Sequence, residues 1–305
     1  GAPAATDDLP SSVLGAEAAG PLAAYQLAVR LHPGAHRLSG QQQVTYPNRT
    51  GIELTEIVFR LYPNLPQYGG LMEIGPTWVD GQPSTASLRA DRTSLVVPLN
   101  SPLAPQASAT ISLTFDIDIP QKNGNYVLFG HSEGIWSLPD AYPLLAVHES
   151  LVGSSGSGTA WYEDLAPPHS DAVFAETAFY DVTLALPSGL TLATTGSIAS
   201  DMEDGMGYRI YQVTGGPLRE FAWLAGANYQ MAETEASGAR VRSYYLAGDE
   251  TAGRAALNAA AAALRLYDEL FGPYPFPELT VVEAPLGHYG MEYPSLNLMG
   301  TDLYR

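Results

Sequence analysis

The sequence predicts a mainly β protein, with an antiparallel, sandwich-like β-domain at its N-terminal end and the first α/β part of a second domain after it. Two observations predict this fold class. From Tyr25 onward, apolar and polar residues alternate with a period of two, which places one face of each strand on a core and the other in water. Near Thr251 the period changes, once, to the spacing of an α-helix.

Composition limits the classes of function. The chain has 305 residues, 46% of them apolar, which is enough for a sizeable core and two domains. Acidic residues number 32 against 14 lysines and arginines, so the net charge of -18 repels nucleic acid and anionic lipid, and no nucleic-acid partner is expected. No run of about 18 or more apolar residues occurs, so no transmembrane segment is predicted. The absence of cysteine excludes disulfides and thiol catalysis.

The N-terminal part of the chain divides into a leader and a β-domain. Residues 1–20 are small, polar and acidic, and we expect them to form a flexible leader. This leader alone suggests an exported or envelope-associated protein, and the compartment is otherwise undetermined. Residues 21–235 contain alternating runs, such as 25–32 and 111–119, separated by turn signals such as VDGQP. They are predicted to form the N-terminal β-domain.

One long helix is predicted from Thr251 onward. Asp249 or Thr251 can cap its start, and Gly272 followed by Pro273 ends it. The short strand LTVVEAP and the stretch GMEYPSL follow, so a second, incomplete domain is predicted over residues 236–305. Six residues share one face of this helix: Leu257, Ala260, Ala261, Leu264, Tyr267 and Phe271.

The histidines do not form a recognisable metal site. A common zinc motif, H-E-x-x-H, needs two histidines on one helical face with a glutamate as base. His148-Glu149 begins such a string, but the second histidine is missing, and proline and glycine break HPGAH between His32 and His36. We therefore predict no metal ligand in this chain and interpret each histidine as a surface or hydrogen-bonded residue. The six histidines are His32, His36, His131, His148, His169 and His288.

The stretch GHSEG, residues 130–134, matches the G-x-S-x-G pattern of serine hydrolases. That pattern places a nucleophilic serine at a turn between a strand and a helix. Here the following residues contain Pro139 and Pro143 and cannot form a long helix. A hairpin turn is therefore the favoured interpretation, and a catalytic Ser132 remains an alternative.

Glu292 is a candidate binding residue within GMEYP, residues 290–294. A carboxylate on a strand bordered by glycine and proline is consistent with an ordinary edge-strand residue. It could also accept charge-assisted hydrogen bonds from a substrate ammonium group. Gly290 would let the backbone of a substrate approach closely.

Several segments resemble one family, the aminopeptidase N-like zinc metallopeptidases, or gluzincins. YGMEYPSL resembles their G-x-M-E-[NY] exopeptidase motif, in a variant that bacterial members share. ALRLYDELFGPYPFPELTVVEAP resembles the helix, turn and strand before that motif. YQLAVRLHPGAHRLSG and FYDVTLALPSGL are similar to strands of the family's saddle-shaped N-terminal β-domain. The resemblance covers roughly residues 25–305.

The resemblance implies a peptide-binding role for the motif. In that family the glutamate binds the free α-amine of the peptide, and the preceding backbone contacts the substrate chain. Substrate binding is thereby implied for Gly290, Met291, Glu292 and Tyr293. Tyr293 stands where asparagine is usual, and no second amine-binding residue is recognisable near residues 145–170.

The resemblance also implies that the zinc site lies outside this chain. The family's H-E-x-x-H motif, its further zinc ligand and its catalytic tyrosine all follow the position of Arg305. We therefore expect the N-terminal fragment of a zinc aminopeptidase, truncated within a thermolysin-like catalytic domain whose remainder is missing. The fragment would have no catalytic residue or cofactor and be inactive alone, with zinc bound in the full-length parent. The alternatives are a non-catalytic β-sandwich module for binding or adhesion, and a serine hydrolase at Ser132.

Overall fold

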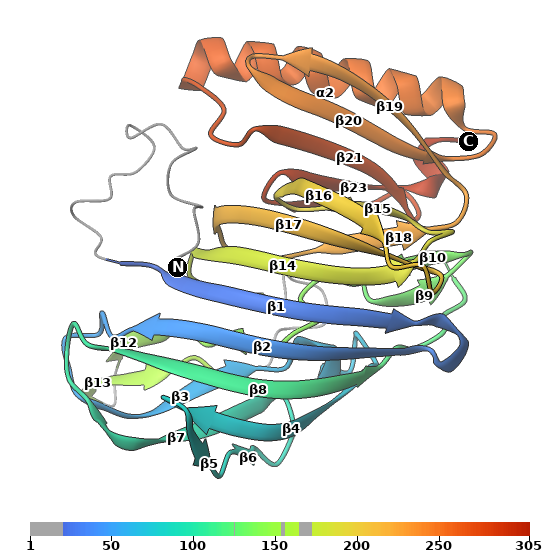
Figure 1. Ribbon diagram of the computed structural model, residues 1–305. Helices are drawn as coiled ribbons and strands as arrows, with labels where there is room; N and C mark the ends of the chain where they lie inside the picture. Colours follow the sequence, from blue (N-terminus) through green and yellow to red (C-terminus); the bar gives the residue numbers. More distant parts are fainter. Residues whose placement is uncertain (1–20, 125, 154–155, 165–172) are drawn as a thin grey trace.

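The computed structural model describes residues 21–124, 126–153, 156–164 and 173–305, and it is mainly β, as the sequence predicts (Figure 1). Within these residues the strands form five sheets, and the one α-helix is α2 (Glu250–Phe271). None of the described helices is long and apolar enough to cross a membrane. The predicted leader lies outside the described residues. The 3-10 helices are η1 (Pro33–Ala35), η2 (Tyr62–Asn64) and η3 (Thr301–Leu303).

The largest sheet has eight strands and turns one face outward (Figure 1). The predicted alternation is confirmed in its strands, since Ile111, Leu113 and Phe115 are buried while Ser112 and Thr114 between them are partly exposed. In spatial order the strands are β16 (Ser197–Glu203), β17 (Tyr208–Leu218), β14 (Ala178–Pro187), β1 (Ala23–His32), β2 (Arg37–Pro47), β8 (Ser108–Asp118), β4 (Leu71–Val79) and β5 (Gln82–Ser84).

One strand pair departs from the antiparallel arrangement that the sequence predicts. β1 pairs antiparallel with β2, but its other neighbour, β14, runs parallel to it, with Ala23 opposite Ala178 and Arg30 opposite Ala185. The predicted antiparallel domain therefore contains a parallel pair at this point. The physical reason is that alternation determines which face of a strand is buried and carries no information about the direction of its neighbour.

Three smaller sheets lie behind the eight-stranded sheet and close its core (Figure 1). The first contains β15 (Thr191–Thr194), β18 (Trp223–Gly226), β10 (Ile135–Ser137) and β9 (Gly130–Ser132). The second contains β11 (Leu144–Leu145), β3 (Leu54–Arg60), β7 (Ser94–Leu103) and β6 (Ser87–Leu88), and the third is the hairpin of β12 (His148–Gly153) and β13 (Gly156–Trp161).

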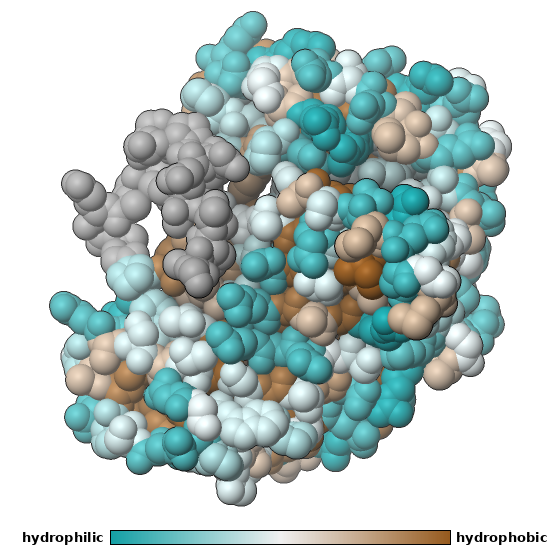
Figure 2. Space-filling model, viewed as in Figure 1, coloured by the Kyte–Doolittle hydropathy of each residue, from teal (hydrophilic) through white to brown (hydrophobic). Residues whose placement is uncertain are grey.

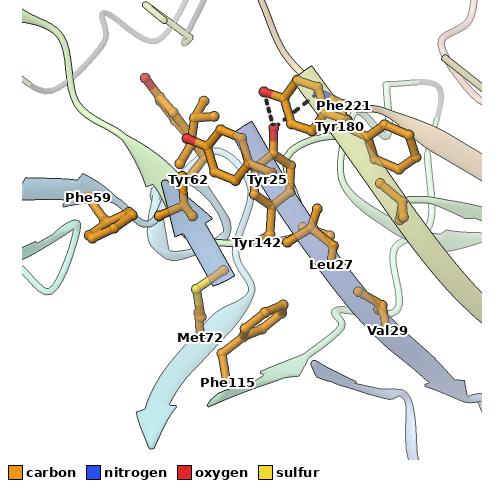
Figure 3. Close-up of a cluster of buried hydrophobic side chains, with 14 of the residues drawn as sticks. Tyr25, Leu27, Val29, Phe59, Tyr62, Met72, Phe115, Tyr142, Tyr180 and Phe221 are labelled. Carbon is orange, nitrogen blue, oxygen red and sulfur yellow. Dashed lines mark hydrogen bonds between the residues drawn. The ribbon is translucent and has the colours of Figure 1, made fainter. Parts of the chain in front are cut away.

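A cluster of tyrosines joins β1 and β14 to the loops behind them (Figure 3). The rings of Tyr25 and Tyr180 stack with their centroids 4.9 Å apart, and the Tyr142 hydroxyl donates to the Tyr180 hydroxyl at 3.0 Å. The Tyr25 and Tyr142 hydroxyls accept from the backbone N–H groups of Leu145 and Phe221. Each of these three buried hydroxyls is therefore satisfied, which removes the usual cost of placing a polar atom in an apolar core.

A five-stranded sheet forms the C-terminal part of the structure. β20, β21 and β23 run parallel, whereas β19 and β22 form antiparallel edges. Its first strand, β19, begins at Tyr229, so the sheet reaches back into the range 21–235 that the sequence assigns to the β-domain. In spatial order the strands are β19 (Tyr229–Ala236), β20 (Ala239–Leu246), β21 (Glu278–Ala284), β23 (Leu296–Gly300) and β22 (Gly290–Tyr293).

Helix α2 covers part of one face of this sheet, against β19, β20 and β21 (Figure 1). Asp249 occupies the predicted capping position, although its side chain makes no capping hydrogen bond, and Gly272 ends the helix with a φ of 96°. The predicted helical face is buried from Leu257 to Leu264. Tyr267 and Phe271 on that face are instead 55% and 81% exposed, because the end of α2 extends beyond the strands that it packs on.

The closest approach between α2 and the sheet depends on a glycine. A Cβ added to Gly253 would overlap the ring of Tyr245 on β20. We expect Gly253→Ala to destabilise the fold by roughly 1–3 kcal/mol, because overpacking outweighs the helix-propensity gain of about 1 kcal/mol. Urea unfolding measures the difference, with Gly34→Ala as the control, since a Cβ there would meet no atom within 4 Å. Equal stability of Gly253→Ala and wild type would contradict this packing.

Candidate functional site

The predicted motif forms an exposed edge strand. β22 pairs with β23 through a tight hairpin turn at Pro294 and Ser295, where Ser295 adopts a left-handed φ of 62°. The Ser295 hydroxyl accepts a hydrogen bond from the backbone N–H of Gly196 at 3.0 Å, which ties the turn to the β-domain. No described strand pairs with the other edge of β22, so its outer backbone N–H and C=O groups are available to a ligand.

Glu292 lies on the α2 side of this edge strand. It is paired across the ladder with Asn297, two residues from Met299, which packs in the cluster beneath α2. Because side chains two residues apart share a face, Glu292 and Asn297 lie on the same face as the helix. The Glu292 side chain is exposed, and its carboxylate has no hydrogen bond or ion pair with any residue that the structure describes. It is therefore an anionic acceptor free to bind a ligand.

Gly290 leaves room for that carboxylate. A Cβ added at Gly290 would lie 2.9 Å from Glu292 Oε1 and 3.3 Å from the carbonyl oxygen of Leu298. A larger residue at this position would therefore displace the Glu292 carboxylate. The missing side chain keeps the backbone and the acceptor accessible from the same side.

Met291 and Tyr293 point to the opposite face and fix the strand. Tyr293 is only 6% exposed and packs against Val282 and Leu296, and Met291 is half-buried against the same cluster. Burial raises the pKa of Tyr293 well above its ordinary value, so its hydroxyl is un-ionised at neutral pH. The four predicted site residues thus divide into two that are exposed, Gly290 and Glu292, and two that anchor the strand.

A groove borders the site between the hairpin and the last three turns of α2. Its volume is about 510 Å³, and its walls are mostly apolar and aromatic. On the hairpin side the groove is lined by Tyr293, Ser295 and Asn297, and Asn297 is the cross-strand partner of Glu292. The sequence did not identify Asn297, whose only signal is one polar residue in the alternating run LNLMG. The helix-side wall contains Ala260, Ala263, Leu264, Tyr267, Asp268 and Phe271.

The loop before β22 is held by backbone contacts. Gly300 is required where the loop crosses β23, because a Cβ there would overlap the carbonyl group of Gly287. The Gly300 N–H donates to the Tyr289 carbonyl at 2.8 Å, and Tyr289 packs edge-on against Tyr126 with centroids 5.6 Å apart. These contacts hold β22 in position against a ligand that would bind its outer edge.

A buried carboxyl pair that the sequence did not reveal lies near Tyr293. Asp140 is fully buried in a left-handed conformation (φ 51°), and neither of its carboxylate oxygens has a partner within the described part of the chain. Burial raises the pKa of Asp140 well above its ordinary value, and the negative charge of Glu220 raises it further. The charges of both carboxyls also contribute to the raised pKa of Tyr293. Asp140 is therefore a buried titratable group, and its backbone N–H donates to the Phe221 carbonyl in the β-domain.

Ser132 does not lie in a nucleophile elbow. It ends β9, which pairs with β10 through a tight turn in which Glu133 and Gly134 have positive φ values. The serine is only 4% exposed, and a strand follows it instead of a helix. The hairpin interpretation is therefore confirmed, and the geometry that exposes a catalytic serine is missing.

The histidines are dispersed or packed against aromatic rings. His131 stacks on Trp136 with centroids 4.1 Å apart, and the ring of His148 contacts Trp161 edge-on. His169 lies outside the described residues. In the described part of the chain, no three residues of the types His, Cys, Asp and Glu come together to hold a metal ion. These residues therefore do not fit a zinc site.

Solved structures with a similar fold are M1 zinc metallopeptidases. A mutant of the enzyme from Deinococcus radiodurans, bound to a Tyr-Ser-Ala substrate, matches with a TM-score of 0.64 and 17% identity, over 93% of this chain and 62% of that chain. A two-domain M1 zinc metallopeptidase mutant bound to L-arginine matches with a TM-score of 0.63 and 18% identity, over 92% and 61%. No protein-family model and no curated protein sequence matches. The likeness shows a shared fold, and this chain spans less than two thirds of those chains.

The buried Asp140 makes the stability of the fold depend on pH. Because its pKa is raised in the folded state, stability should fall as pH rises from the ordinary carboxyl pKa through the folded value. Asp140→Asn cannot ionise, so its urea midpoint should exceed that of the wild type at about pH 8 and approach it at about pH 4. Asp118→Asn, at an exposed position on β8, is the matched control. Parallel pH profiles for wild type and Asp140→Asn would contradict the account.

Proposed function

We propose that this chain is the peptide-binding N-terminal part of a zinc aminopeptidase-like metallopeptidase. The observation that carries the proposal is Glu292, an exposed and unpaired carboxylate on an edge strand beside a groove. The fold supports it, because similar structures are M1 zinc metallopeptidases, one of them bound to a tripeptide substrate. The proposal extends that likeness from the fold to the binding of a peptide.

The edge of β22 supplies backbone groups for an extended peptide. A peptide that adds to an exposed sheet edge gains main-chain hydrogen bonds, while its side chains alternate between the two faces. Gly290 lets the peptide backbone approach closely, and Met291 contributes backbone groups. Tyr293 holds the strand from the buried side. The groove beside α2 is wide enough to receive an apolar side chain of the peptide.

Glu292 supplies the recognition of the peptide's free end. Its carboxylate accepts charge-assisted hydrogen bonds from an α-ammonium group, which are stronger than hydrogen bonds between neutral groups. The net charge of -18 attracts a cationic group toward the site over a longer range. A peptide with a blocked amine loses this interaction and keeps the backbone contacts.

Zinc would be held outside the described residues. No ligand set among the described residues fits it, so no step is assigned here to a metal-bound water. This chain spans 62% of the substrate-bound relative. In the full-length protein the described residues would bind and orient the peptide, and zinc held elsewhere would supply the hydrolytic chemistry.

Removal of the Glu292 carboxylate should impair the hydrolysis of peptides that have a free α-amine. A hydrogen bond to a charged group contributes about 1.5–3 kcal/mol, so Glu292→Ala should lower kcat/KM on a free-amine peptide by roughly ten- to a hundredfold in the full-length protein. The N-acetylated peptide of the same sequence should be affected far less. Glu292→Gln separates loss of charge from loss of shape.

The control for that series is Glu235→Ala, which removes an exposed carboxylate from the opposite edge strand of the same sheet. It should leave kcat/KM unchanged on both the free-amine and the N-acetylated peptide. Equal losses on the free and the acetylated peptide would show that Glu292 is not the amine-binding residue.

The 305-residue chain alone should hold no stoichiometric zinc and should not hydrolyse aminoacyl amides, with or without added zinc. The reason is that the described residues offer no clustered metal ligands and that Ser132 is buried. Metal analysis after dialysis and an amide-hydrolysis assay measure both expectations. One tightly bound zinc per chain would contradict the first, and turnover that disappears in Ser132→Ala would favour a serine hydrolase.

A further inference from the structure

The outward face of the eight-stranded sheet carries a second groove, far in the sequence from the GMEY strand. Figure 1 shows this face uncovered by the other described elements, and Figure 2 shows hydrophilic side chains spread over it. The groove has a volume of about 510 Å³ and crosses β4, β8, β2, β1, β14 and β17. We name it the polar groove, after the outward-facing side chains that line it. Gln26, Gln41 and Gln43 are exposed, and the others are partly exposed: Trp78, Ser112, Thr114, Asp181, Thr183 and Gln212.

The strand register arranges these side chains in two rows across the sheet. One row, from β4 to β14, contains Trp78, Ser112, Gln43, Gln26 and Asp181. The other, from β8 to β17, contains Thr114, Gln41, Ala28, Thr183 and Gln212. With strands about 4.8 Å apart, the first row extends over roughly 19 Å. The small side chain of Ala28 leaves the middle of the second row open, which hollows the surface into a groove.

Most of the hydrogen-bonding capacity of the polar groove is unused. Gln43 donates to Gln26 at 3.4 Å, and the Thr183 hydroxyl donates to Gln212 at 3.0 Å. The side chains of Asp181, Gln41 and Ser112 have no hydrogen bond or ion pair with any described residue. The groove therefore presents amide donors and acceptors, hydroxyls and one carboxylate to a ligand that has both donors and acceptors of its own.

The charge of the groove lining limits which class of ligand can bind there. On a chain with a net charge of -18, the lining of the polar groove contains a single ionisable side chain, Asp181. A polyanion finds no cation in the groove, and a polycation finds only one carboxylate. The electrostatic match is therefore to a neutral molecule with many hydroxyl groups.

Trp78 adds an apolar surface at one end of the first row. Its neighbours Thr77 and Val79 are buried, whereas Trp78 is half-exposed on the outward face. The flat face of an indole ring packs well against the C–H face of a pyranose ring, whose hydroxyls point outward toward surrounding amides. A peptide fits less well, because the strands beneath the groove are already paired on both edges and offer it no backbone partner.

We propose that the polar groove binds a neutral oligosaccharide, with Trp78 packing against a sugar ring and the glutamines and Asp181 binding its hydroxyls. This site is separate from the peptide site at β22, and the proposal does not depend on the proposed peptidase function. A binding surface of this kind would hold the protein on a neutral glycan while leaving the edge of β22 accessible.

The test is titration of the 305-residue chain with four neutral hexasaccharides, namely cellohexaose, laminarihexaose, maltohexaose and chitohexaose, by calorimetry. We expect at least one to bind, and Trp78→Ala to weaken that binding roughly tenfold or more. The double variant Gln26→Ala/Gln43→Ala should also weaken it. Phe174→Ala and Gln230→Ala, an exposed aromatic residue and an exposed glutamine away from the groove, should bind as the wild type does.

Three outcomes would overturn the proposal. The first is that none of the four hexasaccharides binds. The second is that one binds but the Trp78→Ala and Gln26→Ala/Gln43→Ala variants retain wild-type affinity, which would place the sugar elsewhere. The third is that heparin or the acetylated peptide binds in their place and loses affinity in these variants. Circular dichroism establishes whether each variant is folded. If Trp78→Ala does not fold, the double variant Gln26→Ala/Gln43→Ala still tests the groove.

Discussion

An apolar cluster between the five-stranded sheet and the β-domain determines where the candidate peptide site lies. Ile135 and Leu224 of the β-domain pack against Val282, Leu296 and Leu298, and all five are fully buried. Helix α2 covers β19, β20 and β21 from the other side. Because the middle of the sheet is buried on both faces, ligand access is restricted to its edge at β22 and to the groove beside the end of α2.

The two large sheets therefore present different surfaces. The eight-stranded sheet is buried on one face and open on the other, so its exposed side chains form rows across neighbouring strands. The five-stranded sheet exposes an edge, whose unpaired backbone groups suit an extended chain. The β-domain also encloses the carboxyl of Asp140, whose pKa is raised by burial. The described residues thus separate an exposed strand edge from a polar sheet face.

Sequence patterns predicted the helix and the strands better than they predicted which strands pair with each other. The change of period gave α2 within one residue of its start, because Leu257, Ala261 and Leu264 recur at helical spacing. The parallel pairing of β1 with β14 and the burial of Asp140 left no such signal, because both depend on segments far apart in the chain. The two rows of side chains in the polar groove likewise depend on the register between paired strands, which the sequence does not show. At the GMEY strand, the sequence proposed Glu292 as a binding residue and gave no signal for Asn297, its partner across the hairpin.

The central claim is that Glu292 binds the α-ammonium group of a peptide added to the edge of β22. The most direct measurement is a crystal structure of the full-length protein with the tripeptide Tyr-Ser-Ala bound. The account predicts the terminal nitrogen at about 2.7–2.9 Å from a Glu292 carboxylate oxygen, with the peptide backbone paired to β22. A tripeptide bound with its amine away from Glu292, or away from the edge of β22, would contradict it.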